Sequence, residues 1–135
     1  MARTTADLDT ADFDFLAERH VGTLTTLRSD GSPHVVAIAF GYEPDEGRVR
    51  VICGEGGQKV VNVDRTPWAV VTQVDGPRWL SLEGPARVVR DDERVARAVA
   101  AFEARYRPAS ERPDRVAIEI DVERILGRSA ITRPS

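Results

Sequence analysis

The sequence is short of several residue types, and each shortage excludes a class of protein. A single cysteine, Cys53, excludes an intrachain disulfide framework and a cysteine-rich zinc site. No apolar run approaches the roughly 20 residues that a membrane-spanning helix needs, and the acidic stretch after Arg3 lacks the apolar core of a signal peptide. The formal net charge of -3 argues against nucleic acid or anionic membranes as partners. We therefore expect a cytoplasmic protein that binds neither.

Lysine is also nearly absent, since 18 of the 19 basic residues are arginine and only Lys59 is a lysine. Such a bias fits a GC-rich genome, so the number of arginines by itself indicates no function. The position of Lys59 is more informative. A predicted strand over 48–53 runs into Gly54-Glu55-Gly56-Gly57, and a helix is predicted to begin at or just before Lys59.

A junction of this kind can bind an anion. The first N–H groups of a helix are unpaired and carry partial positive charge. Glycines let an anion approach the backbone, and the Lys59 ammonium adds a full charge. The segment is not a Walker loop, because it contains no Gly-Lys-Ser/Thr, and a plain turn into a helix has the same spacing. Residues 54–59 are still the best candidate for a phosphate site in the sequence.

The alternation of apolar and polar residues predicts six strands and three helices in one domain of 135 residues. The predicted strands cover 21–28, 34–42, 48–53, 68–74, 78–90 and 116–122. The predicted helices cover 10–19, about 58–65, and 91–106. Short turns join most of the strands, which indicates antiparallel pairing. Because a small antiparallel sheet tends to close into a barrel, we expect an α+β fold: a six-stranded antiparallel β-barrel with flanking helices.

Three segments are expected to depart from this regular pattern. The strand over 78–90 contains Gly84-Pro85, where we expect a bulge or a bend. Residues 1–9 are expected to form a flexible N-terminus, and residues 128–135 a C-terminal tail. The single barrel domain therefore occupies the chain from 1 to 135.

Six segments along the chain form a recognisable pattern. They are Glu18-Arg19-His20, Thr25-Thr26-Leu27-Arg28, Ser32-Pro33-His34-Val35-Val36, Gln58-Lys59, Asn62-Val63-Asp64-Arg65, and the stretch from Gln73 to Gly84. In this order they resemble the pyridoxamine-5′-phosphate-oxidase-like family, whose fold is the FMN-binding split β-barrel. More narrowly, they resemble its actinobacterial branch that uses the deazaflavin coenzyme F420, and within it the biliverdin reductases. The resemblance extends from about residue 15 to residue 127.

The resemblance implies a homodimer with two cofactor sites at the subunit interface. Lys59 matches the lysine that binds the cofactor phosphate, and Gly57 and Gln58 match the positions beside it. Arg65 would lie near the phosphate or near the acidic tail of the cofactor. Oxidases of the family typically have arginine or serine where this chain has Gln58 and Gly57, and this difference argues against a flavin oxidase.

The resemblance also implies which residues meet the cofactor ring. Ile52 and Cys53 match a strand end that lies along the ring system. Val36 and Ala37 lie on the neighbouring strand, which supplies backbone contacts to the ring. Trp79 matches a position that faces the ring from the partner subunit, although a plain place in the dimer core would also suit a tryptophan.

The activity that the resemblance implies is hydride transfer from C5 of the reduced deazaflavin to a conjugated acceptor, with biliverdin, reduced to bilirubin, as the expected one. Two alternatives stay open. One is an FMN-dependent reductase of a quinone or nitro compound, and the other is a non-catalytic protein that binds coenzyme F420 or a tetrapyrrole. Because the cofactor carries the chemistry, we predict no catalytic residue in the protein.

A few polar residues are candidates for contact with the small-molecule substrate. These are His34, Arg28 and Arg78, since arginine pairs well with carboxylates such as propionates. Arg48 and Arg50 alternate with valines along one predicted strand. We expect them either to form a solvated face or to meet the carboxylates of a polyglutamate tail. No metal site is expected, because His20 and His34 have no accompanying ligand spacing.

Overall fold

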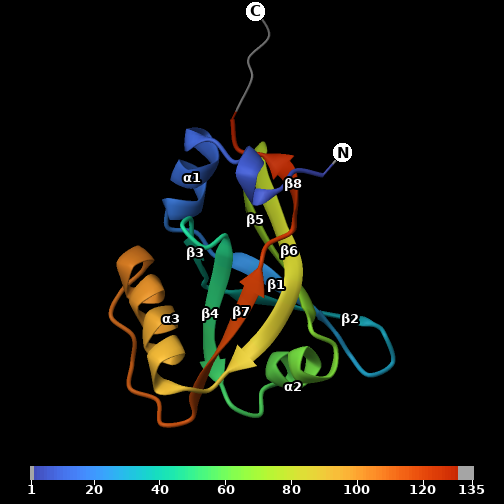
Figure 1. The fold of residues 1–135 in the computed structure, drawn as a ribbon, viewed down its shortest axis with the longest axis vertical. Helices are drawn as coiled ribbons and strands as arrows, with labels where there is room; N and C mark the ends of the chain where they lie inside the picture. Colours follow the sequence, from blue (N-terminus) through green and yellow to red (C-terminus); the bar gives the residue numbers. More distant parts are fainter. Residues whose placement is uncertain (1, 131–135) are drawn as a thin grey trace, which may run out of the picture.

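The computed structural model describes residues 2–130 of the chain, which form helices around one antiparallel sheet (Figure 1). The helices are the 3-10 helix η1 (Thr5–Asp7), α1 (Thr10–Ala17), α2 (Gln58–Arg65) and α3 (Asp92–Arg105). The strands are β1 (Gly22–Leu27), β2 (Pro33–Ile38), β3 (Gly41–Glu43), β4 (Arg48–Gly54), β5 (Trp68–Asp75), β6 (Arg78–Val89), β7 (Arg115–Asp121) and β8 (Arg124–Arg128). The three predicted helices are confirmed. No helix among the described residues is long and apolar enough to cross a membrane.

The described residues form eight strands, so the prediction of six was wrong. One reason is that the single strand predicted over 34–42 divides into β2 and β3. Phe40 lies at the division, and its N–H donates to the Tyr106 hydroxyl at 3.2 Å while its carbonyl accepts from Arg105 at 2.7 Å. Side chains at the end of α3 thus take the hydrogen bonds that a continuing strand would have supplied. After the division, β3 pairs with β4.

The second reason is β8, which was not predicted. This strand returns after β7 and pairs with the first half of β6. Only Ile125 of its five residues is buried, so its pattern of polarity is weak. The predicted C-terminal tail over 128–135 begins at the last residue of β8, and its part over 131–135 lies outside the described residues.

All strand pairs are antiparallel, in the order β2-β1-β5-β6-β7-β4-β3. The long strand β6 holds the sheet together, because β5 and β8 pair with its first part and β7 pairs with residues 86–89. The partners change at Gly84-Pro85, where Figure 1 shows β6 curving. A Cβ atom at Gly84 would meet the Asp121 carbonyl, so a glycine is required for this close approach.

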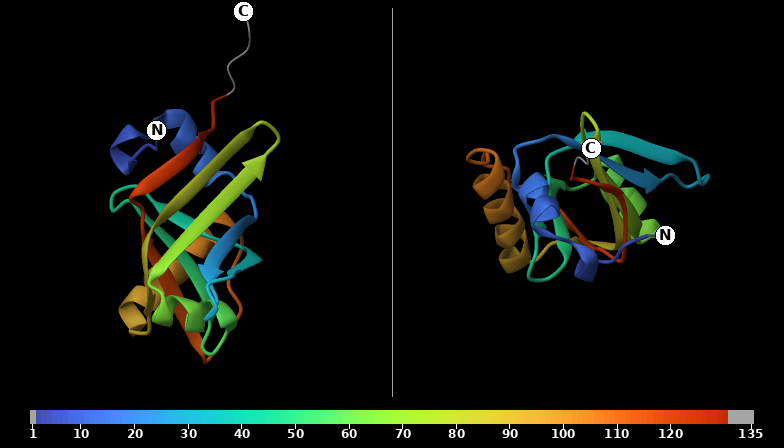
Figure 2. Two further views of the ribbon diagram at one scale, coloured as in Figure 1. Left: turned by 90° about the vertical axis from the view of Figure 1, so that its right-hand side faces the viewer. Right: turned by 90° about the horizontal axis from the view of Figure 1, so that it is seen from above.

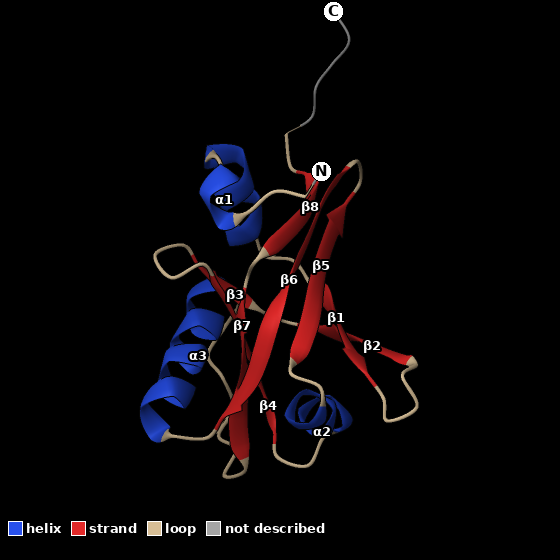
Figure 3. Cartoon of the chain, turned by 45° about the vertical axis from the view of Figure 1, so that its right-hand side comes forward, coloured by secondary structure: helices blue, strands red, loops and turns tan. Residues whose placement is uncertain are grey.

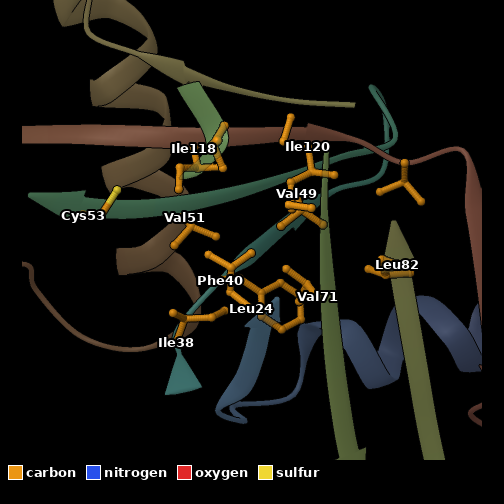
Figure 4. Packing of buried hydrophobic residues seen from close by; sticks show 14 of the residues in the cluster. Leu24, Ile38, Phe40, Val49, Val51, Cys53, Val71, Leu82, Ile118 and Ile120 are labelled. Carbon is orange, nitrogen blue, oxygen red and sulfur yellow. The ribbon is translucent and has the colours of Figure 1, made fainter. Parts of the chain in front are cut away.

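The curved sheet encloses the hydrophobic core, as the view from above shows (Figure 2). Side chains from most strands meet there, and Leu24, Phe40, Val51, Leu82 and Ile118 are almost completely buried (Figure 4). α3 packs outside the sheet against β4 and β7, whereas α2 packs against β1 and β6. α2 therefore lies at one end of the sheet, beside the β1–β2 hairpin (Figure 3).

Candidate functional site

The junction between β4 and α2 has the geometry of an anion site. Gly56 adopts a φ of 83°, a left-handed conformation that favours glycine. Gly57 is the N-cap residue of α2 and offers no side chain to cap the helix. Among residues 2–130, the backbone N–H groups of Gln58 and Lys59 donate no hydrogen bond. The start of α2 therefore presents unpaired donors with partial positive charge.

Lys59 adds a full charge at the same place. Its side chain is half-buried, and within the described part of the chain its ammonium forms no ion pair. Its charge is close enough to act on the Cys53 thiol at the end of β4. A buried or half-buried ammonium is costly without an anion, so this arrangement suits a phosphate or another oxyanion.

A polar network fixes α2 to β1. Asn62 is fully buried, and its side-chain amide donates to the Thr26 hydroxyl at 3.0 Å. Gln58 donates to the Asn62 side-chain oxygen at 2.7 Å, and Arg65 donates to the same oxygen at 3.1 Å and to the Leu27 carbonyl at 2.7 Å. Gln58 and Arg65, both predicted to bind cofactor, thus also position the helix.

The predicted residues of β2 lie next to this network. His34 is the cross-strand partner of Thr26, and Val36 is the partner of Leu24. The Nδ1 atom of His34 is shielded from solvent and has no hydrogen-bond partner among residues 2–130. Such an orphaned polar atom is costly, and it suggests a ligand contact that the isolated chain does not supply. Ala37 is exposed on the opposite face of the strand.

The side chains at the end of β4 are already packed. Ile52 lies under α3 with Val89, Ala98 and Ala117, whereas Cys53 belongs to the main core (Figure 4). Burial raises the pKa of the Cys53 thiol to about 11, so this thiol is a packing residue rather than a nucleophile. A cofactor ring at this strand end would therefore meet the backbone rather than these two side chains.

A cavity next to the strand end was not anticipated from the sequence. Its volume is about 370 Å³, and it lies between β4, α3 and the segment 107–114. Three arginines line it: Arg107, Arg112 and Arg115. The sequence showed this segment only as a polar loop before a strand. The one available signal was the density of arginines near residue 110, which does not tell where the loop packs.

Two predicted residues, Trp79 and Arg78, lie elsewhere. They begin β6, whose start is at the opposite end of the sheet from α2 (Figure 1). The Trp79 ring covers Gly127 of β8 and is 40% exposed. Arg78 donates to Glu18 at 2.7 and 2.9 Å and also pairs with Asp75. Within one chain, neither residue can reach a ligand at α2.

Arg28 is also engaged, although it lies nearer to α2. Its guanidinium donates to the Pro33 carbonyl at 2.5 Å across the β1–β2 turn. The suggestion that Arg48 and Arg50 form a solvated face or hold a tail was wrong for Arg50, which is only 2% exposed. Arg50 pairs with Glu119 and with Glu43.

His20 has carboxylate neighbours that the sequence spacing did not reveal. Its Nε2 lies 2.9 Å from a Glu18 oxygen and 3.7 Å from an Asp75 oxygen. These three side chains could in principle share a metal ion, but the Arg78 guanidinium already pairs with both carboxylates. The hydrogen bonds from Arg78, which have the largest effect, and the hydrogen bond from His20 lower the pKa of Glu18 to about 2. The group is therefore best described as an ion-pair cluster.

The whole pattern can now be compared with known proteins. Residues 8–129 match the family described as pyridoxamine 5′-phosphate oxidase. The chain belongs to this family. It is 50% identical, over 127 residues, to an F420H(2)-dependent biliverdin reductase of Mycobacterium tuberculosis (strain CDC 1551 / Oshkosh). The aligned residues cover 94% of this chain and 93% of the relative. The predicted family resemblance is thereby confirmed.

Solved structures of the family share the fold. An F420 reductase superposes with a TM-score of 0.69 at 25% identity, covering 84% of this chain and 94% of its own. A putative pyridoxamine 5′-phosphate oxidase of Listeria innocua superposes with a TM-score of 0.72 at 23% identity, covering 90% of this chain and 100% of its own. The second likeness shows the fold alone.

Proposed function

We propose that this protein is a coenzyme F420-dependent oxidoreductase that reduces a conjugated acceptor, and that the acceptor is biliverdin. The observation that carries the proposal lies at the start of α2, where the Lys59 ammonium and the N–H groups of Gln58 and Lys59 stand together without partners among residues 2–130. The 50% identical relative, whose name states this activity, supports the same reading.

The residues at this junction fit the phosphate of such a cofactor. Two free N–H groups and one ammonium can together satisfy several phosphate oxygens. A Cβ added at Gly57 would have only the Gly54 carbonyl oxygen, at 3.5 Å, within contact range. The approach to the backbone is therefore open on this side, as a bulky anion requires.

When bound, reduced coenzyme F420 supplies the hydride from C5 of its deazaflavin. The protein itself has to hold two flat molecules face to face and exclude water. The half-buried Val36 offers apolar contact for a ring, and the backbone at Ile52 and Cys53 offers polar groups to its edge. His34, with its orphaned Nδ1, is proposed to meet the acceptor. Binding and orientation by these groups need no acid or nucleophile from the chain.

We propose that two chains form a homodimer through the outer face of β2, β1, β5, β6 and β8. These strands face the viewer in the left view of Figure 2. One row of cross-strand neighbours contains no charge: Ala37, Thr23, Thr72, Ser81 and Leu126. Val74 is 62% exposed beside Trp79. An uncharged row of this kind, flanked by charged residues, is typical of an interface core with a polar rim, and it would bring Trp79 to the cofactor site of the partner.

Replacing Lys59 tests the proposed site. A charge-assisted hydrogen bond contributes about 1.5–3 kcal/mol, so Lys59→Ala should weaken coenzyme F420 binding by roughly 10- to 100-fold. Deazaflavin fluorescence titration measures the affinity. The control is Arg19→Ala, which removes one exposed positive charge outside the site. Equal affinity of both variants and the unmodified protein would remove the basis of the proposed phosphate site.

The activity is tested with the unmodified protein. Reduced coenzyme F420 is mixed with biliverdin, with a quinone or with a nitro compound, and its reoxidation is followed. Reoxidation with biliverdin is the expected result. Tight binding without reoxidation by any acceptor would instead indicate a carrier of the cofactor, and retention of FMN with reoxidation of reduced flavin would indicate the FMN-dependent alternative.

A further inference from the structure

The cavity lined by Arg107, Arg112 and Arg115 has a strong excess of positive charge. No carboxylate is among its lining residues, which otherwise include Ile52, Phe102 and Ser110. Arg112 pairs with Asp114 at 2.8 Å. Arg107 and Arg115 have no ion-pair partner in the part of the chain that the structure describes.

Ion pairing alone does not distinguish the arginines of the cavity. Eight others lie within 4 Å of a carboxylate: Arg3, Arg48, Arg50, Arg78, Arg87, Arg90, Arg97 and Arg124. The remaining arginines outside the cavity, among residues 2–130, have no such partner. What distinguishes the cavity is that three guanidinium groups share one lining. Three guanidinium groups around one hollow carry like charges that a bound anion would offset. Arg107 and Arg112 are exposed and Arg115 is half-buried, so solvent reduces their mutual repulsion. The cavity therefore has the charge of a ligand site.

The cavity borders the proposed cofactor site through Ile52 and Cys53 at the end of β4. The Glu55 N–H, in the turn before α2, donates to the Asp114 carbonyl at 2.9 Å. The Arg112 guanidinium lies against Gly54, so closely that a side chain there would displace it. Both Arg112 and Lys59 act on the Cys53 thiol. A molecule held at the start of α2 can thus extend toward the three arginines.

We propose that this cavity is a subsite for carboxylate groups of the molecules that bind beside α2. The inference rests on the proposed function. Guanidinium groups pair with carboxylates through two parallel hydrogen bonds, and they keep their charge at any working pH. Phe102 and Ile52 supply the apolar wall. Two molecules of the proposed reaction could provide the carboxylates: the glutamyl tail of the cofactor or the propionates of the acceptor.

The test uses the double variant Arg107→Gln/Arg115→Gln, which removes the two unpaired charges. Its matched control is Arg19→Gln/Arg94→Gln, which removes two exposed charges that do not line the cavity. The single variant Arg107→Gln changes only an exposed loop residue, so it keeps the test decisive if the double variant folds poorly. Affinities are measured by titration for coenzyme F420 with and without its glutamyl tail, and for biliverdin and its dimethyl ester.

The expected result is a loss of about 10-fold or more in affinity for one molecule, either tailed coenzyme F420 or biliverdin, with the form that lacks the glutamyl tail or has esterified propionates unaffected. A loss confined to tailed coenzyme F420 assigns the subsite to the cofactor, and a loss confined to biliverdin assigns it to the acceptor. Unchanged affinities in the variants, with normal binding by the unmodified protein, would overturn this inference alone. Failure of the unmodified protein to bind either form of the cofactor would overturn the proposed function together with it.

Discussion

At the scale of single residues, the arginines show how much a side chain's role depends on its distant neighbours. Arg50 looks like one member of an exposed pair along a strand, yet it is buried against Glu119, which lies 69 positions later in the chain. Glu119 also accepts from Arg87 at 2.9 Å. The carboxylate of a fully buried glutamate in β7 thus bridges guanidinium groups from the strands on either side of it, β4 and β6.

This arrangement leads to a prediction for Glu119→Gln. Removing one partner of a buried ion pair costs about 3–5 kcal/mol when the other charge is left unpaired. Arg50 keeps Glu43 and Glu46, and Arg87 keeps Asp121, so these carboxylates reduce the cost. We therefore expect the free energy of unfolding to fall by less than that amount but measurably, as followed by chemical denaturation. The control Glu123→Gln changes an exposed carboxylate close by and should have little effect. A loss no larger than that of the control would show that Arg50 does not depend on Glu119.

At the scale of elements, one ion-pair cluster joins three segments. Glu18 follows α1, Asp75 ends β5, and Arg78 begins β6. A second group of contacts joins the end of α3 to the same region, because the Tyr106 hydroxyl donates to the His20 carbonyl at 2.6 Å and Arg105 donates to the Glu18 carbonyl at 2.7 Å. Side chains therefore hold the segment between α1 and β1 in place from two sides.

The cluster predicts a dependence of stability on pH. Hydrogen bonds from Arg78, and then His20, lower the pKa of Glu18 from 4.5 to about 2. A carboxyl group whose pKa is lower in the folded state stabilises that state above its unfolded pKa, and this contribution disappears as the pH falls toward about 2. Because the Glu18 side chain is 40% exposed, solvent reduces the size of the effect.

The variant Glu18→Gln should consequently lose less stability on acidification than the unmodified protein. Urea denaturation at about pH 7 and about pH 3 gives the two free energies of unfolding to compare. Glu111→Gln, in the exposed loop before β7, serves as the control and should behave as the unmodified protein does. An identical fall for Glu18→Gln would mean that Glu18 contributes nothing to acid sensitivity.

At the scale of the whole molecule, the proposed homodimer depends on the position of Trp79. Trp79 and the start of α2 lie at opposite ends of one sheet (Figure 1), so they can meet at one ligand only across a subunit interface. The outer face of β1, β5 and β6 is the surface on which the proposed dimer depends. Thr72 of β5 lies in the middle of this face, because its cross-strand partners are Thr23 in β1 and Ser81 in β6.

A charge at this point should separate the subunits. Thr72→Asp would place two carboxylates in a desolvated interface, which is unfavourable without partners. We expect this variant to be monomeric in sedimentation and to bind coenzyme F420 poorly, because the proposed site is shared. The matched change Ala104→Asp, on the exposed side of α3, should leave the dimer intact. A Thr72→Asp protein that is dimeric and binds normally would exclude this face as the interface.

The sequence by itself determined the features that depend on near neighbours. Alternating apolar residues and short turns predicted most strands, and the helix after Gly54–Gly57 began where its glycines and Lys59 indicated, because a glycine turn and a helix start obey local backbone rules. The tertiary structure alone decided the features that need distant partners. Arg105 and Tyr106 divide β2 from β3, and β8 forms by pairing with β6 and with Arg3. The loop 107–114 brings Arg112 beside the glycine turn. Hydrogen bonds and ion pairs between residues far apart in the chain leave no periodic trace in the sequence, and this is why the arginine cavity could not be foreseen.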